Sequence, residues 1–184
     1  MSTTINGINV EDLNSTISAV KGNPAAARCT FRSHTVWSKG FQSRAQIGDY
    51  EQAGARVPRG RTFQLSGDHP EGLLGQNTAP AAVEALIAAT GACIAGNWAT
   101  FGAAMSIPVE TLEIDLEGDI DLQGFMGLGD GVRPGLERIR GKIYVKSPAT
   151  DEQLQQLKET AEKLSPVVDS LRLPVQTELV RMKR

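Results

Sequence analysis

The sequence predicts an α+β protein in which two groups of antiparallel strands lie around one long, buried helix. The stretch ALIAATGACIAGNWATFGAAM, residues 85–105, contains no charged side chain. Segments that alternate apolar and polar residues precede and follow it, and a second helical pattern comes later in the chain. Strands, a buried helix, strands and a helix in that order favour an α+β fold over a doubly wound parallel sheet.

The chain before residue 48 is predicted to hold a short helix and a β-hairpin. Apolar residues recur at helical spacing over 10–20, and the pattern ends at Gly22, a residue type that commonly follows a helix. Residues 29–37 form an extended run. Gly40 then turns this run into a partner strand over residues 41–47.

The segment that leads to the long helix is predicted to contain a loop and a third strand. Residues 48–60 are polar and show no clear periodicity, so we expect a mobile loop there, followed by a strand over 62–65. Asn77 or Thr78 can cap the long helix. Pro80 is tolerated in a first helical turn, where its missing N–H costs nothing.

Two further amphipathic strands are predicted after the long helix. Leu112, Ile114 and Leu116 alternate with acidic residues, which is typical of a strand whose acidic face is in water. Residues 139–145 form the second strand. The glycine-rich connection over 124–135 matches neither a phosphate-binding loop nor a dinucleotide fingerprint, because no GK[ST] follows and it lies between two strands.

The last part of the chain is predicted to contain a helix, a short helical turn and a strand. Thr150 begins a capping box with an acidic first turn, so a helix is expected to about Leu164. Ser165 and the proline after it interrupt the chain, and a short helical turn reaches Leu171. A final strand is expected over 175–180.

Composition limits the classes of function. A chain of 184 residues with a formal charge of −2 and a pI near 5.7 is one ordinary domain, without the basic surface that nucleic acid binding requires. The N-terminus has no basic region followed by an apolar run, so a cytoplasmic location is expected. Two cysteines and two histidines without short ligand spacing argue against a disulfide framework or a metal site, and no cofactor is expected.

The long helix is predicted to be covered by protein, in the core or at a dimer interface. A helix that is apolar on every face has to be buried in protein or lipid. Its Ala, Gly and Thr residues and the internal Asn97 differ from the Leu, Ile, Phe and Val that drive insertion into a bilayer, so no membrane partner is expected. Trp98, Phe101 and Met105 either pack in the core or line a pocket for a small hydrophobic ligand.

Three stretches resemble the OsmC/Ohr family. TAPAAVEALIAATGAC is similar to the family's central-helix motif NPxELLLAALGAC, which carries a peroxide-reactive cysteine, and Cys93 takes that place. LEGDIDLQGFMGLGDGVRPGLERI and SPVVDSLRLPV resemble a longer branch that has an N-terminal helical extension. The resemblance implies an OsmC-like domain over 26–184 and a helical extension over 1–25.

The resemblance also implies an activity. Family members form an intertwined homodimer in which two long helices lie at the centre and each active site forms near the subunit interface. The reactive thiolate attacks a small hydrophobic hydroperoxide and yields a sulfenic acid and an alcohol. A second cysteine then forms a disulfide, and a thiol reductant restores both thiols. The attack needs a thiolate, and a nearby positive charge or helix N-terminus favours that form.

The chain departs from the family pattern at two positions. Ser165 stands where the family has its resolving cysteine, so the implied hydroperoxide reductase would run a one-cysteine cycle at Cys93. The family glutamate ten residues before the reactive cysteine is Val83 here. Glu84 is the nearest carboxylate, but at about 100° per residue it points away from Cys93 and would serve the partner subunit or a structural role. The resemblance implies an activating arginine from the first hairpin, for which the chain offers Arg44 as the first choice and Arg32 as the second. A strand arginine that faces solvent is the alternative.

Other interpretations stay open at this point. Cys29 could resolve an oxidised Cys93, or it could be a small buried hydrophobe. A hydrolase could combine Cys93 with His69 and Asp68, although these two residues lie in an apparent turn. Cys93 itself could be an inert thiol. The alternative function is a non-catalytic protein that binds a small hydrophobic ligand at the dimer interface.

Overall fold

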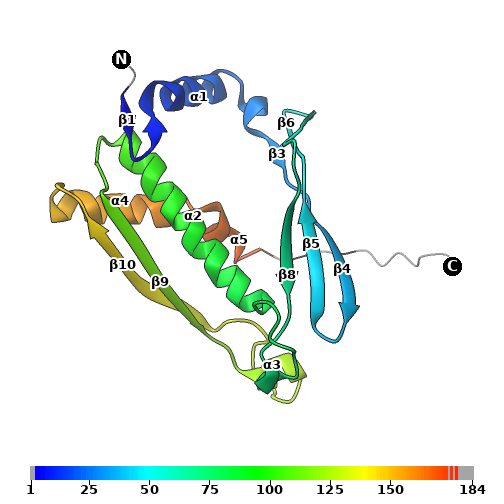
Figure 1. The fold of residues 1–184 in the computed structure, drawn as a ribbon. Helices are drawn as coiled ribbons and strands as arrows, with labels where there is room; N and C mark the ends of the chain where they lie inside the picture. The colour runs from blue at the N-terminus through cyan, green and yellow to red at the C-terminus, as the bar shows by residue number, and fades with distance from the viewer. Residues whose placement is uncertain (1–2, 174, 176, 178–184) are drawn as a thin grey trace.

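The long helix is the centre of the fold. The computed structural model describes residues 3–173, 175 and 177. Helix α2 (Ala82–Ala104) runs through the molecule, and a hairpin of β9 (Thr111–Asp119) and β10 (Arg138–Lys146) lies along it (Figure 1). Helices α4 (Asp151–Lys163) and α5 (Pro166–Ser170) pack on α2 as well. The predicted α+β class, with antiparallel strands and a long central helix, is confirmed.

The N-terminal segment forms a small hairpin and a helix. Strands β1 (Thr4–Ile5) and β2 (Ile8–Asn9) pair with each other and contact α2. Helix α1 (Val10–Gly22) follows, as predicted, because the Asn9 side chain accepts hydrogen bonds from two backbone N–H groups of its first turn. A 3₁₀ turn over Pro24–Ala27 leads to the first group of strands.

Six further strands between α1 and α2 form two antiparallel sheets, β3–β6–β7 and β4–β5–β8. Their bounds are β3 (Cys29–Thr30), β4 (His34–Lys39), β5 (Gln42–Ile47), β6 (Tyr50–Gln52), β7 (Ala55–Val57) and β8 (Phe63–Gly67). The predicted hairpin around Gly40 and the third strand are confirmed. In the described residues, the β4–β5–β8 sheet stands apart from α2 within the single chain (Figure 1).

Two predictions for this region were wrong. The run 29–37 is not one strand, because the chain is interrupted between β3 and β4, which belong to different sheets. The expected loop over 48–60 contains the β6–β7 hairpin. Ala53 and Gly54 have φ values of 52° and 78° and make the tight turn. Strands of three residues are too short to show an alternating pattern, so the sequence gives no periodic signal there.

The start of α2 also differs from the prediction. Neither Asn77 nor Thr78 caps the helix, and Pro80 lies before its first turn. The N-cap residue is Ala81, whose backbone N–H donates to a Glu84 carboxylate oxygen at 2.7 Å. Glu84 thus satisfies the cap from inside the first turn, which is one half of a capping box.

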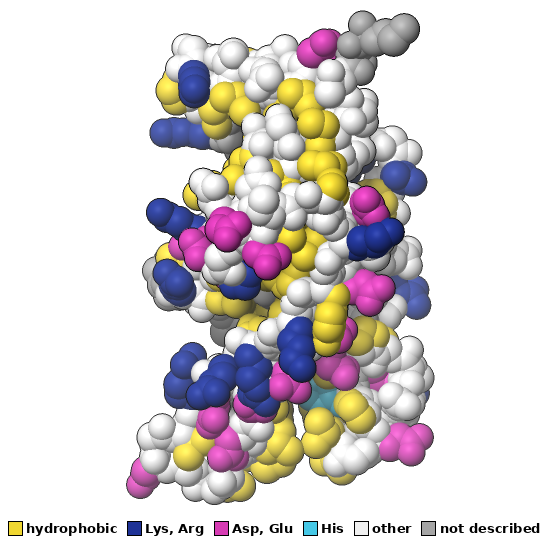
Figure 2. All heavy atoms as spheres, turned by 90° about the vertical axis from the view of Figure 1, so that its left-hand side faces the viewer, with side chains coloured by type: hydrophobic (Ala, Val, Ile, Leu, Met, Phe, Trp, Pro, Cys, Tyr) yellow, Lys and Arg dark blue, Asp and Glu magenta, His cyan; other side chains and the backbone are white. Residues whose placement is uncertain are grey.

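The β9–β10 hairpin has the predicted apolar face and the predicted solvent-exposed face. Leu112, Ile114 and Leu116 face α2, while the acidic residues between them are exposed. Arg140 of β10 pairs with Glu117 and Asp119 across the strands. Figure 2 shows basic and acidic side chains interspersed on the side of the molecule that is at the left in Figure 1. The outer surface of the hairpin is therefore a charge-paired, solvated face.

The core of the single chain lies between the C-terminal half of α2, the hairpin and α4. Trp98, Ile107, Leu157 and Ala161 are nearly or fully buried, and Phe101 and Met105 pack against them, so these aromatic and Met side chains serve the core. The capping box at Thr150 and the helical turn after Ser165 are confirmed. The glycine-rich connection contains a short helix, α3 (Leu122–Met126). The predicted strand over 175–180 lies largely outside the described residues.

Candidate functional site

The cysteine of the long helix contacts a buried serine from the C-terminal part of the chain. Cys93 is partly exposed on α2. Its Sγ atom lies 3.2 Å from Oγ of Ser165, which is fully buried. The Val168 backbone N–H donates to the same Oγ at 3.3 Å. The structure thus brings together two residues that the sequence singled out separately.

Local rules of helix termination explain why Ser165 reaches Cys93. Helix α4 ends at Lys163, with Leu164 as its C-cap. Pro166 starts α5, because proline is favoured in a first helical turn. Ser165 is the N-cap between the two helices. Asn97 fixes α4 against α2 by donating from Nδ2 to the Ala161 carbonyl at 2.8 Å. The junction between α4 and α5 is therefore held beside the middle of α2.

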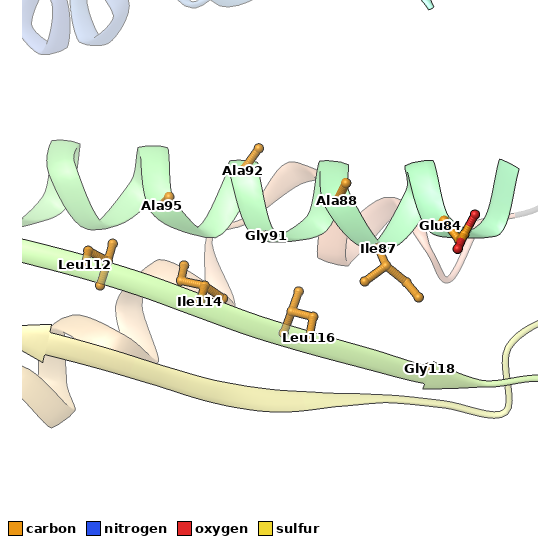
Figure 3. A pocket seen from close by; sticks show the side chains of 10 residues that line it. All are labelled: Glu84, Ile87, Ala88, Gly91, Ala92, Ala95, Leu112, Ile114, Leu116 and Gly118. Carbon is orange, nitrogen blue, oxygen red and sulfur yellow. The ribbon is translucent and has the colours of Figure 1, made fainter. Parts of the chain in front are cut away.

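Glu84 lies on a different side of α2 from the Cys93–Ser165 contact. Its side chain is at one end of a groove between α2 and β9 (Figure 3). The groove has a volume of about 680 Å³, and its apolar lining includes Ile87, Ile114 and Leu116. The carboxylate is already engaged by the Ala81 N–H. Within one chain, Glu84 therefore caps the helix and does not meet the thiol.

Arg44 is not beside Cys93 within one chain. It lies on β5 and is exposed, on a sheet face that it shares with Val36 and Ser66. Figure 1 shows β5 and α2 in separate parts of the chain. A contact between Arg44 and the thiol would require a second subunit.

Asp68 is a buried acid that holds the segment before α2. Its carboxylate accepts hydrogen bonds from the Thr78 hydroxyl at 2.6 Å and from the backbone N–H groups of Thr78, His69 and Gln76. These bonds hold the pKa of Asp68 well below its usual value, and the bond from the Thr78 hydroxyl has the largest effect. Burial acts in the opposite direction and raises this pKa. This role of Asp68 was not predicted from the sequence. The signal was an aspartate at the start of a turn, where its side chain bonds to nearby backbone.

The geometry of Asp68 and His69 does not fit the hydrolase interpretation. Asp68 accepts from the His69 backbone N–H, so its carboxylate does not orient the imidazole ring. The ring stacks on Phe41 instead, with centroids 4.1 Å apart. Cys29 lies exposed on β3, where it pairs with Gln52 of β6. In the residues that the structure describes, no cluster of three His, Cys, Asp or Glu side chains could hold a metal ion.

The chain matches the family model of OsmC-like proteins over residues 75–180, more than half of its length, which includes α2, the β9–β10 hairpin and the Cys93–Ser165 contact. The chain belongs to the OsmC-like family. No curated protein matches it in sequence.

Solved structures share the OsmC-like fold. An OsmC-like protein from Mycoplasma pneumoniae is 16% identical, with a TM-score of 0.59 over 78% of this chain and 87% of that chain. An organic hydroperoxide resistance protein OsmC from Legionella pneumophila is 13% identical, with a TM-score of 0.53 over 78% of this chain and 89% of that one. At such identities the likeness shows the fold alone.

The OsmC-like fold gives a context for the apolar character of α2. By length and composition this helix could cross a membrane. In the fold it packs against β9, α4, α5 and the β1–β2 hairpin, which is the arrangement of a core helix. Several small or apolar residues on its remaining side are exposed in the single chain, namely Ala82, Ala85, Leu86, Ala89, Ala92 and Gly96.

Proposed function

We propose that this OsmC-like protein is a thiol-dependent hydroperoxide reductase in which Cys93 is the reactive residue. The contact between Cys93 Sγ and Ser165 Oγ carries the proposal, because Ser165 stands where the family resemblance puts a resolving cysteine. A side chain at position 165 is therefore within bonding reach of an oxidised Cys93. The Legionella relative, described as an organic hydroperoxide resistance protein, supports the same class of substrate.

The proposed cycle uses one cysteine. The Cys93 thiolate attacks the terminal oxygen of an organic hydroperoxide, so that an S–O bond forms, the O–O bond breaks and an alkoxide leaves, which takes a proton from water to become the alcohol. A thiol reductant then attacks the sulfenic acid and releases water, giving a mixed disulfide. A second reductant thiol breaks that disulfide and returns Cys93. Ser165 cannot replace the reductant, because a hydroxyl forms no disulfide.

We further propose that the protein acts as a homodimer. The uncovered side of α2 is apolar and built from small residues, which allows a second helix to approach closely. Arg44 and Glu84, both remote from Cys93 in their own chain, would then act on the partner's thiol. Residues 1–25 would form an extension to an OsmC-like domain over 26–184. A cytoplasmic location remains a prediction.

The first experiment tests whether Cys93 reacts with a hydroperoxide. Purified protein is treated with stoichiometric cumene hydroperoxide and then dimedone, and its intact mass is measured. We expect one dimedone adduct per chain in the wild type and in Cys29→Ser, and none in Cys93→Ser. An unreactive Cys93 in folded protein would contradict the proposal that the protein is a hydroperoxide reductase.

A second candidate function is supported by the groove between α2 and β9. Its apolar lining suits a small hydrophobic ligand, and α2 supplies one of its walls (Figure 3). A hydrophobic ligand that copurifies and binds equally well to Cys93→Ser would favour this non-catalytic function. Turnover of hydroperoxide that depends on Cys93 would favour the reductase.

A further inference from the structure

We propose that the Ser165 hydroxyl is a hydrogen-bond donor that stabilises the thiolate of Cys93. In this proposal Ser165 has a role of its own, in addition to being a residue that cannot act as the resolving cysteine. Its contribution to peroxide reduction rests on the proposed function, whereas its effect on the ionisation of Cys93 does not. Ser165 touches the reacting sulfur and would be a catalytic residue of the one-cysteine cycle.

The hydrogen-bond partners of Ser165 define the direction of this bond. A hydroxyl has one hydrogen to donate and two lone pairs that accept. The Val168 N–H already donates to Oγ, and Cys93 Sγ is the acceptor within reach of the hydroxyl hydrogen. A thiolate has no hydrogen, so once Cys93 ionises only Ser165 can be the donor in this pair.

Burial strengthens the hydrogen bond between Ser165 and the Cys93 thiolate. Ser165 has an exposed fraction of 0%, so water does not compete for its hydroxyl. A hydrogen bond to a charged group contributes more than one to a neutral group, and it gains strength where the local dielectric is low. The N-cap geometry fixes the Oγ atom before Cys93 ionises. The donor is therefore in position when negative charge develops on Sγ.

The test measures the pH dependence of alkylation in the absence of peroxide. The full-length protein is treated with iodoacetamide between pH 5 and 10 (about the range in which thiols titrate), and each cysteine is followed by peptide mass spectrometry. In Ser165→Ala we expect the rise in the Cys93 alkylation rate to move to higher pH by about one unit, so that the rate at neutral pH falls about tenfold. Ser165→Thr, which keeps a hydroxyl, should restore the wild-type profile.

Two controls separate this effect from a loosened helix. Ser170→Ala removes another hydroxyl of α5, one that donates to the Pro166 carbonyl and does not touch Cys93, so it should leave the profile unchanged. Alkylation of Cys29 is an internal reference in every sample. Loss of the N-cap alone would change the alkylation rate of Cys93 by the same factor at every pH, so the midpoint of the profile would not move.

The outcomes decide the proposal either way. A Ser165→Ala profile with the wild-type midpoint overturns it, whatever the absolute rate. If Ser165→Ala does not fold, Ser165→Gly takes its place under the same criterion, because glycine is accepted at an N-cap. The profile could shift in Ser165→Ala although the wild-type protein does not react with cumene hydroperoxide. That result would support the Ser165 hydrogen bond and contradict the reductase function.

Discussion

The roles of single side chains in this protein depend on the hydrogen bonds that they make. Ser165 is the N-cap of α5 and contacts the sulfur of Cys93, although the two residues are 72 positions apart in the chain. Glu84 resembles a displaced catalytic acid in the sequence, yet within one chain its carboxylate caps α2. The residue type alone did not distinguish these roles, because the deciding hydrogen bonds are made through space.

Asp68 gives a prediction at the scale of one residue. Because the folded protein holds the pKa of Asp68 below the usual value of 3.8, its carboxylate stabilises the fold above that pH. The contribution is lost as the pH falls below 3.8 toward the folded value. Asp68→Asn should therefore lower the melting temperature at pH 7, and the difference from wild type should shrink below about pH 4.

Thermal denaturation by circular dichroism from pH 3 to 8 (about the range over which carboxyls titrate) measures this effect. Asp130→Asn is the matched control, because Asp130 is exposed. A melting difference for Asp68→Asn that stays constant over this range would contradict the assigned role.

At the scale of elements, close approaches on α2 decide which glycines can change. A Cβ atom at Gly102 would lie 2.5 Å from Nδ2 of Asn6 and 3.0 Å from the Ile107 carbonyl oxygen. Asn6 donates to that carbonyl and accepts from the Val109 N–H, so it ties the β1–β2 hairpin to the chain after α2. Gly102→Ala should destabilise the protein by about 1–3 kcal/mol through overpacking.

Gly91→Ala is the matched control on the same helix. Its Cβ would meet a Leu116 methyl at 3.6 Å, an ordinary contact, and alanine adds up to about 1 kcal/mol of helix propensity. Urea denaturation of both variants measures the free energy of unfolding. Equal effects of the two substitutions would show that the Asn6 bridge does not constrain Gly102.

At the scale of the whole molecule, the uncovered side of α2 predicts association. Ala89 lies in the middle of that side and is exposed in the single chain. A charge there would be buried without a partner in a dimer, so Ala89→Arg should convert a dimer to a monomer. Light scattering coupled to size-exclusion chromatography measures the mass in solution.

Glu113→Arg is the control for this experiment, because Glu113 lies on the exposed face of β9, away from α2. It should leave the mass unchanged. A wild-type protein that is monomeric at all concentrations would contradict the dimer, and with it the proposed action of Arg44 on a partner's thiol.

The sequence by itself determined the class of fold, the long uncharged helix, the capping box at Thr150 and the β9–β10 strands. These features depend on periodicity and on local caps, which act between neighbours in the chain. The resemblance around Cys93 also identified the OsmC-like family, which the family match confirms.

Only the tertiary structure decided the environment of each candidate side chain. In the folded chain Ser165 lies beside Cys93, and Glu84 caps α2. Asp68 is buried among backbone N–H donors, and Arg44 lies on an exposed sheet face. The short β6–β7 hairpin was also missed, because three-residue strands carry no period. Contacts between distant residues depend on how α2, α4 and α5 pack, and packing is not encoded in any local pattern.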